Sequence, residues 1–351
     1  MKQTYLITGG SGFIGSNLVN RLLEDNNNIV VNVDKLTYAS NEKFMDHKKK
    51  SNYIFYKKDI SKNKEINKII AKHKPDYIFH LAAESHVDRS IDNPSNFIDS
   101  NIIGTYSLLN ESYLYWKKLN LKKRARFRFI MVSTDEVYGS LKLNENKFEE
   151  QNPYKPNSPY AATKASADLL SRAWSKTYNF PVIITNTCNN YGPWQFPEKL
   201  IPLTINKCIR KEKIPVYGKG NQIRDWIHVH DHVEGLIFAS NNGKIGEKYN
   251  IGSNNELKNI NVVNSICDNF DKINSFKYGS SRKLIKFVKD RPGHDKRYAI
   301  DSNKINKLGW KSKISWNEGL ISTINWYLNN PKYLKQISKD SYSGERLGII
   351  K

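Results

Sequence analysis

The sequence predicts an α/β fold, in which a doubly wound parallel sheet is followed by a smaller, irregular C-terminal lobe. Two observations carry this prediction. Short apolar runs alternate with amphipathic helical stretches as far as about residue 190, and strands that alternate with helices pair in parallel. Beyond that point the chain is rich in proline and glycine, as in 191–202, 214–222 and 290–298, which is typical of a lobe that covers a ligand.

The elements of the first part follow one another as strand and helix. Residues 4–8 form an apolar run, and after a glycine turn Leu18, Val19, Leu22 and Leu23 recur at helical spacing. The same reading continues to residue 187, with Pro159 near the first turn of the last helix. We expect strand 28–34, helix 62–73, strand 76–82, helix 96–117, strand 128–134, helix 158–178 and strand 181–187.

This pattern divides the chain into two domains. Residues 1–190 form a cofactor-binding domain, and residues 191–351 mainly form the second lobe. We expect the chain to return to the first domain near 226–252. We find no internal repeat and no low-complexity linker.

Composition excludes several classes of protein. The net charge of +22 and the basic runs at 47–50 and 117–128 are compatible with nucleic-acid binding, but lysines are spread along the whole chain, which is typical of a solvated surface. We therefore expect no nucleic-acid partner, although the charge favours an anionic small substrate. Cys188, Cys208 and Cys267 are far apart in sequence, which argues against a disulfide framework and a zinc site. No apolar stretch of membrane-spanning length and no secretion signal is present, so we expect a cytoplasmic protein without a membrane partner.

The first glycines predict a dinucleotide site. Gly9, Gly12 and Gly15 follow a strand and open a helix, so that the backbone can approach a pyrophosphate at the helix N-terminus. This is the phosphate turn of a Rossmann-type sheet. Asp34 ends the next strand, where a carboxylate accepts from a ribose 2′-hydroxyl and repels a 2′-phosphate. The pattern favours NAD over NADP, although the neighbouring Lys35 leaves this choice open.

Tyr160 and Lys164 lie four residues apart on one predicted helix and therefore on one face. An ammonium group near a phenol lowers the phenol pKa, which makes Tyr160 a candidate base for a sugar hydroxyl. An ordinary surface pair is the alternative. Ser133 or Thr134 could supply the hydroxyl that aligns a substrate alcohol.

Asp135 and Glu136 stand side by side at the exit of the strand 128–134. Two adjacent carboxylates beside a core strand are costly because of lost hydration and mutual repulsion. A helix cap or turn pair is one explanation. A pair used for acid and base chemistry is the other.

Together these features resemble the extended short-chain dehydrogenase/reductase family. Over residues 4–330 the chain looks like the dTDP-glucose 4,6-dehydratases within it, because the stretches that match them occur in that family's order. The matching stretches are DKLTYAS, HLAAESHVDRSI, STDEVYG, SPYAATKAS, NNYGPWQFPEKLIPL, YGKGNQIRDW, YNIGSNNE and DRPGHDKRYAID. The segment 140–159 is shorter than in several members of the family, which affects the mouth of the site and not its chemistry.

The resemblance implies an NAD-dependent hydro-lyase that acts on dTDP-glucose. Carbon 4 is oxidised, which acidifies the hydrogen on carbon 5 and permits loss of water from carbons 5 and 6. Glu136 then takes the proton, Asp135 gives one to the departing hydroxyl, and Thr134 binds the carbon 4 oxygen. The hydride returns to carbon 6, which gives a 4-keto-6-deoxy sugar nucleotide for deoxysugar synthesis.

The resemblance also implies two sets of binding residues. The expected NAD contacts are Gly9, Gly12, Phe13, Ile14, Gly15, Asp34, Lys35, Leu36, Thr37, Asp59, Ile60, Leu81, Ala82, Ala83, Ser85, Tyr160, Lys164 and Asn190. The expected contacts with the sugar nucleotide are Ser85, Thr134, Asn190, Lys199, Leu200, Pro215, Tyr217, Arg224, Asn259, Arg291, His294 and Tyr298. Arg224 and Arg291 suit a diphosphate because a guanidinium can contact it through two parallel hydrogen bonds.

Other readings remain open at this stage. A nucleotide-sugar 4-epimerase shares the cofactor site and the Tyr-Lys pair, and a UDP-sugar 4,6-dehydratase shares the chemistry but accepts uracil in place of thymine. A non-catalytic nucleotide sensor is a third reading. His228 and His230 suggest a metal cluster on one strand face, but no third ligand has a supporting spacing, so we expect no metal. By analogy with the family we expect a homodimer built from helices 96–117 and 158–178.

Overall fold

A seven-stranded parallel sheet organises the computed structural model, which describes residues 2–290 and 293–340. Its strand order is β10-β6-β5-β4-β1-β2-β3, and every neighbouring pair is parallel. This confirms the predicted doubly wound fold and adds β3, which sequence analysis did not assign. The strands are β1 (Gln3–Thr8), β2 (Asn28–Asp34), β3 (Tyr53–Lys57), β4 (Tyr77–His80), β5 (Arg128–Thr134), β6 (Val182–Thr187) and β10 (Lys248–Ile251).

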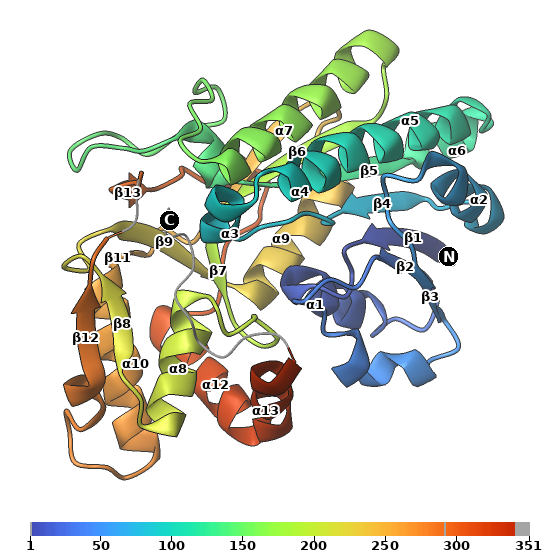
Figure 1. Cartoon of the computed structure of the whole chain (residues 1–351). Coiled ribbons are helices and arrows are strands. Elements are labelled where there is room, and N and C mark those ends of the chain that lie inside the picture. Colours follow the sequence, from blue (N-terminus) through green and yellow to red (C-terminus); the bar gives the residue numbers. More distant parts are fainter. Residues whose placement is uncertain (1, 291–292, 341–351) are drawn as a thin grey trace.

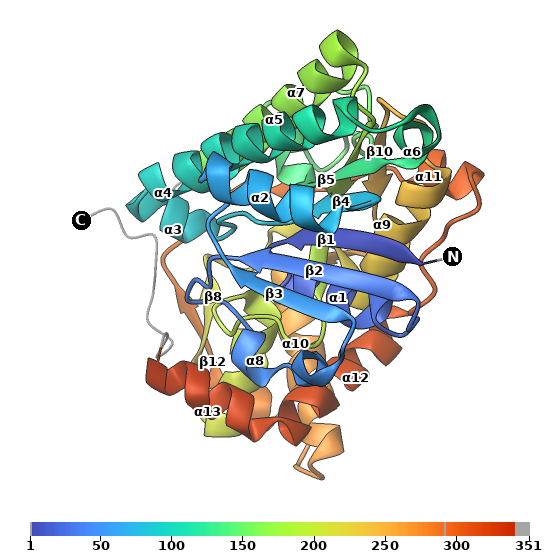
Figure 2. The same ribbon diagram turned by 90° about the vertical axis from the view of Figure 1, so that its right-hand side faces the viewer.

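Helices cover both faces of this sheet (Figure 2). On one face lie α2 (Asn63–His73), α5 (Gly104–Lys117) and α7 (Pro159–Tyr178); on the other lie α1 (Phe13–Leu22) and α9 (Val229–Asn242). Each face has its own apolar core, one built around Phe129 and Phe180 and the other around Ile7 and Leu18. Both β10 and α9 come from the second half of the chain.

The second lobe has more regular structure than its proline and glycine content predicts (Figure 1). Its central strand β9 (Ile223–His228) pairs with β7 (Asn189–Tyr191), β11 (Glu256–Lys258) and β13 (Arg297–Tyr298), and β8 (Ile214–Tyr217) pairs with β12 (Ile285–Val288). A third apolar core, which includes Phe196, Phe270 and Tyr327, joins this lobe to its helices. These helices are α8 (Leu200–Arg210), α10 (Asn259–Ile273), α12 (Trp316–Asn329) and α13 (Pro331–Asp340).

The predicted helix 96–117 consists of three consecutive parts. It comprises α4 (Ser95–Phe97), a π-helical segment (Ile98–Ile103) and α5. The basic run 117–128 contains α6 (Leu121–Arg126), none of whose residues is buried. The remaining short elements are α3 (Val87–Asp92), α11 (Asn303–Lys307) and the 3₁₀ turns Glu42–Phe44, Asp46–Lys49, Asp135–Tyr138 and Ser281–Leu284.

Candidate active site

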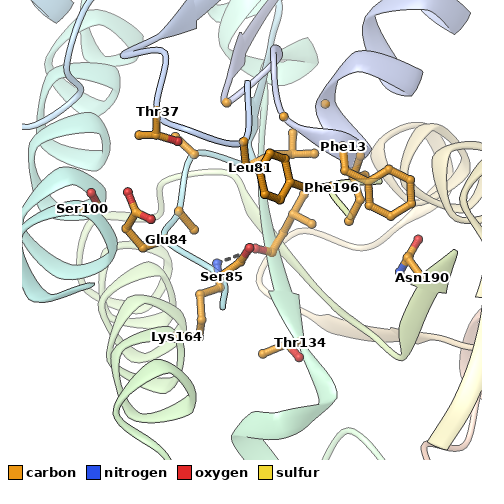
Figure 3. Close-up of a pocket in the computed structure, with 18 of the residues that line it drawn as sticks. Phe13, Thr37, Leu81, Glu84, Ser85, Ser100, Thr134, Lys164, Asn190 and Phe196 are labelled. Atoms are coloured by element: carbon orange, nitrogen blue, oxygen red, sulfur yellow. Dashed lines mark hydrogen bonds between the residues drawn. The ribbon is translucent and has the colours of Figure 1, made fainter. Parts of the chain in front are cut away.

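A cavity of about 290 Å³ lies at the C-terminal edge of the parallel sheet. Gly9, Lys35, Leu81, Asp135 and Cys188, which follow β1, β2, β4, β5 and β6, all line it. Ligands of doubly wound sheets bind at this edge. In Figure 3, Thr134 and Lys164 lie at one end of the cavity and Thr37 lies at the opposite end.

The glycine turn at the start of α1 is closely packed. Gly9 has φ +72°, and a Cβ on Gly9 would stand 2.6 Å from the backbone N of Ala82. A Cβ on Gly15 would stand 2.1 Å from the carbonyl oxygen of Gly9. Gly12 is the N-cap residue of α1, so the first N–H groups of this helix are available at the cavity wall. This arrangement suits a pyrophosphate, as the sequence predicts.

Asp34 is held in place at the end of β2. Its carboxylate accepts backbone N–H bonds from Leu36 at 2.7 Å and from Ser11 at 3.1 Å. Burial raises the pKa of Asp34, and these two hydrogen bonds oppose that shift. Together with the glycine turn, a fixed carboxylate at this position fits the adenosine half of NAD.

Asp135 and Glu136 begin the 3₁₀ turn that follows β5. The Thr134 hydroxyl accepts from the backbone N–H of Glu136 and donates to Asp135 Oδ1, both at 3.3 Å. Asp135 is 2% exposed, and within the described part of the chain its Oδ2 has no hydrogen-bond partner. Burial and the charge of Glu136 raise the pKa of Asp135 well above its usual value, against the opposing charge of Arg224. These surroundings therefore favour the protonated form of Asp135, which is the form that a general acid needs.

Tyr160 and Lys164 lie on the first turns of α7, whose N-cap is Ser158. Burial and the charge of Glu136 raise the pKa of Tyr160, although a hydrogen bond with Thr134 opposes the shift. The pKa of Tyr160 is therefore raised, and our expectation that it is shifted toward neutrality is wrong. Lys164 Nζ donates to the Val132 carbonyl at 2.7 Å, and burial lowers the pKa of Lys164 to about 8.

The choice between Ser133 and Thr134 follows from their partners. Ser133 Oγ donates to Asp168 Oδ2 at 2.8 Å, whereas Thr134 contacts Asp135 and Tyr160. Thr134 is therefore the hydroxyl that shares its site with the two candidate proton carriers.

Comparison with known proteins agrees with this geometry. The GDP-mannose 4,6-dehydratase family matches residues 6–323. A dTDP-glucose 4,6-dehydratase from Escherichia coli is 48% identical, and the match covers 98% of this chain and 99% of the relative.

Two solved structures extend the match to the fold. The dTDP-glucose 4,6-dehydratase from Bacillus anthracis str. Ames, in complex with NAD, has 39% identity and a TM-score of 0.83, with 95% of this chain and 99% of the other covered. The enzyme of that name from Streptomyces venezuelae, with NAD and TYD bound, has 37% identity and a TM-score of 0.85, with 95% and 100% covered. The chain belongs to the dTDP-glucose 4,6-dehydratase family.

Most residues that the family pattern predicts meet in the cavity. All predicted NAD contacts except Leu36 line it, as do Thr134, Asp135, Glu136 and Lys199. Seven predicted substrate contacts do not line it, and they come mainly from the second lobe. These are Leu200, Pro215, Tyr217, Arg224, Asn259, His294 and Tyr298. Arg291 lies outside the described residues.

Two of these second-lobe residues have partners of their own. Arg224 is 5% exposed, stacks 4.1 Å from the centre of the Tyr298 ring, and donates to the carbonyl oxygens of Ile223 and Asp295 at 2.7 and 3.0 Å. Tyr217 donates to Asp88 Oδ2 at 3.1 Å. Their binding roles in this dehydratase family remain predictions.

Sequence analysis missed several cavity residues. Glu84 and Ser100 line the cavity, as do Tyr38 and Glu198, which share a 2.8 Å hydrogen bond. Glu198 also accepts from Arg89 Nε at 2.9 Å. The available signal was that Tyr38 and Glu84 fall within the matched stretches DKLTYAS and HLAAESHVDRSI.

The histidines differ from the predicted strand-face cluster. His228 ends β9, and its side chain caps α9 by accepting the His230 N–H at 3.4 Å, so His230 already lies on a helix. His232 contacts Asn190 at 2.9 Å, and His80 is packed between Thr8 and Thr105 as expected. Over residues 2–290 and 293–340 no group of three potential ligands could hold a metal ion.

The structure bears on two further expectations. Cys208 and Cys267, far apart in sequence, meet through a side-chain hydrogen bond in the core of the second lobe. In the part of the chain that the structure describes, no helix is long and apolar enough to cross a membrane.

Proposed function

We propose that this chain is an NAD-dependent hydro-lyase that converts dTDP-glucose to dTDP-4-keto-6-deoxyglucose. The observation that carries the proposal is the buried Asp135, whose pKa is raised well above its usual value, beside Glu136 in one cavity with Tyr160 and Lys164. An acid that must expel a hydroxyl group needs its own proton at neutral pH, and the raised pKa of Asp135 favours this protonated form.

The cofactor site is built by the chain's own backbone and one carboxylate. The glycine turn and the N-terminus of α1 would hold the pyrophosphate, and Asp34 would hold the adenosine ribose. NAD, when bound, accepts a hydride from carbon 4 of the hexose and returns it to carbon 6.

In the oxidation, Tyr160 removes the proton of the carbon 4 hydroxyl. Thr134 orients that oxygen because its own hydroxyl contacts Tyr160. Lys164 lies one turn further along the same helix, and a positive charge there would favour the phenolate that this step requires, against the burial and the Glu136 charge that raise the pKa of Tyr160. The keto group at carbon 4 then acidifies the hydrogen on carbon 5.

In the elimination, Glu136 accepts the carbon 5 proton and Asp135 donates its proton to the hydroxyl leaving carbon 6. Asp135 is the more deeply buried of the two, and burial together with the charge of Glu136 raises the pKa of Asp135, which favours Asp135 as the proton donor of the pair. A nucleotide-sugar 4-epimerase has no step that uses such an acid, so the pair favours the dehydratase over the epimerase.

The experiment compares dTDP-glucose with UDP-glucose at matched concentrations. We expect a product with the alkali-induced ultraviolet absorbance of a 4-keto-6-deoxy sugar from dTDP-glucose. The two bases differ by one methyl group, worth about 1 kcal/mol of apolar contact, so the base alone should make UDP-glucose react roughly fivefold less efficiently. Turnover of either substrate to a 4-epimer without this absorbance would contradict the proposal, and faster turnover of UDP-glucose would reassign the base.

We further propose how the molecule is organised. The domain 1–190, with β10 and α9, would bind NAD, and the lobe 191–351 would bind most of the sugar nucleotide in the cytoplasm. Large apolar side chains are exposed on the two helical regions expected to form a homodimer interface, and this supports a dimer. They are Ile98, Ile103, Tyr106, Leu114, Leu169 and Tyr178.

A further inference from the structure

Lys35 is the cation nearest in sequence to the expected adenosine site, since it follows Asp34 directly. Its side chain turns to two other cavity residues. Lys35 Nζ donates to Ser100 Oγ at 2.5 Å and lies 3.4 Å from Glu84 Oε1. Figure 3 shows Glu84 and Ser100 next to each other on the cavity wall.

Glu84 is fixed in this place by its backbone. Its N–H donates to Asn101 Oδ1 at 2.9 Å, and Asn101 Nδ2 donates back to the Glu84 carbonyl at 3.0 Å. Asn101 is buried and also donates to Thr163 on α7 at 2.9 Å. The Lys35 side chain is 36% exposed, but that of Glu84 is only 14% exposed, so the carboxylate is shielded from water on most sides and its pair with Lys35 is screened less than a fully exposed pair.

A 2′-phosphate on the adenosine ribose adds a strong negative charge beside the carboxylate at the end of β2. Rossmann-type proteins that accept it place a basic side chain nearby. Lys35 is the residue at this position, and its ammonium is already engaged by Glu84 and Ser100.

We propose that Glu84 is a specificity-determining residue that makes this site select NAD over NADP. It holds the ammonium of Lys35 at the cavity wall and adds a second negative charge to that of Asp34. This inference rests on the proposed function in one respect, namely that NAD is the cofactor. It assigns the choice between the two dinucleotides to a carboxylate on the loop after β4.

A second lysine provides an internal comparison. Lys58 also lines the cavity, and its Nζ lies 2.6 Å from Glu65 Oε1. Both side chains of this pair are 42% exposed. Water already screens this pair, so its loss should change dinucleotide selection little. Neutralising Glu65 changes the net charge by the same amount as neutralising Glu84.

The test measures dissociation constants of NAD and NADP for the full chain, stripped of dinucleotide and titrated by fluorescence or calorimetry. In Glu84→Gln we expect the ratio of the NADP to the NAD dissociation constant to fall at least about tenfold. In Glu65→Gln it should change less than about twofold. Adding Lys35→Gln to Glu84→Gln should remove the gain, because the freed ammonium is what binds the phosphate.

Three outcomes would overturn the proposal. They are an unchanged ratio in Glu84→Gln, an equal gain in Glu65→Gln, and a gain that persists when Lys35 is replaced. These titrations use no sugar substrate, so they are independent of whether the chain dehydrates dTDP-glucose. Retained NAD binding in Glu84→Gln confirms that the variant is folded.

Discussion

Asp135 and Glu136 are chemically similar residues in different surroundings. Asp135 is buried, and one of its carboxylate oxygens accepts a hydrogen bond from the Thr134 hydroxyl. Its pKa is raised well above normal by burial and by the charge of Glu136. The same arrangement that makes Asp135 a proton donor also makes its ionised form unfavourable in the folded protein. Catalytic fitness and stability are therefore opposed at this residue.

We predict that Asp135→Asn stabilises the protein as pH rises. A raised folded pKa means that the native state keeps a proton which the unfolded chain loses, so the wild type loses stability as pH rises above the normal aspartate pKa. The slope for such a group is about 1.4 kcal/mol per pH unit until the folded pKa is reached. The amide has no such loss.

The measurement is urea unfolding of both proteins at pH 4 and at pH 7. The variant should be close to the wild type at the lower pH and more stable at the higher one. A stability difference that is the same at both pH values would show that Asp135 is ionised in the folded protein.

At the residue scale, the candidate proton donors and acceptors were predictable from the sequence, but the pKa shifts of their side chains were not. Asp135 and Glu136 are adjacent in the chain, and Tyr160 and Lys164 share a helix face, so both pairs could be read directly. The pKa of Tyr160 could not be predicted in this way, because it depends on the burial of the side chain and on the charge of Glu136 in the folded protein. Glu84 and Glu198 were missed because their partners, Lys35 and Arg89, are distant in sequence.

The β1-turn-α1 unit shows how an element sets the cofactor site. Gly15 and Gly12 belong to the same turn but have different space around them. A Cβ on Gly15 would meet the Gly9 carbonyl oxygen at 2.1 Å, whereas a Cβ on Gly12 would lie 3.4 Å from the same atom. Since the clash at Gly15 is with backbone, the turn itself would have to move.

We predict that Gly15→Ala destabilises the protein without NAD by about 1–3 kcal/mol. Gly12→Ala, the matched control, should stay within about 1 kcal/mol of the wild type, because its φ of −78° is allowed for alanine. Chemical denaturation of the dinucleotide-free proteins measures both. Equal stability of the two variants would mean that the turn is looser than the structure shows.

At the element scale, the strongly patterned βα units were predictable and the weakly patterned ones were not. The predicted strands 28–34 and 128–134 match β2 and β5, because a run of mainly apolar residues predicts a buried strand at each of these positions. In the second lobe, α10 contains several asparagine residues, and its apolar face includes Val262, Ile266 and Phe270. That face becomes clear only when α8 and the rest of the third core pack on it.

The whole molecule places one cavity beside the sheet and most predicted substrate contacts in the second lobe. Sequence order cannot give this arrangement, because β7, β9 and β13 meet from three distant parts of the chain. The chain passes from β9 of the second lobe into α9, and from β10 of the seven-stranded sheet into β11 of the second lobe. These two passages connect the lobes covalently. The net charge of +22 is spread over this surface and fits an anionic substrate without identifying it.

We predict that the α5 and α7 surface holds two copies of the chain together. Leu169 on α7 is 57% exposed, and a charge there would be buried in the dimer, so Leu169→Glu should shift the protein toward monomers. Leu121→Glu on α6 is the control, since Leu121 is 83% exposed and lies outside both helices. Sedimentation velocity over a range of concentrations distinguishes the species, and a Leu169→Glu dimer as tight as the wild type would exclude this surface.

The central claim is that Asp135 and Glu136 carry out the elimination, whereas Tyr160 serves the oxidation. The most direct test mixes the double variant Asp135→Asn/Glu136→Gln with dTDP-glucose and follows two absorbances, that of reduced nicotinamide and that of the alkali-treated product. We predict that product formation falls at least about 10³-fold while reduced nicotinamide accumulates. Full formation of the 4-keto-6-deoxy product by this variant would contradict the account.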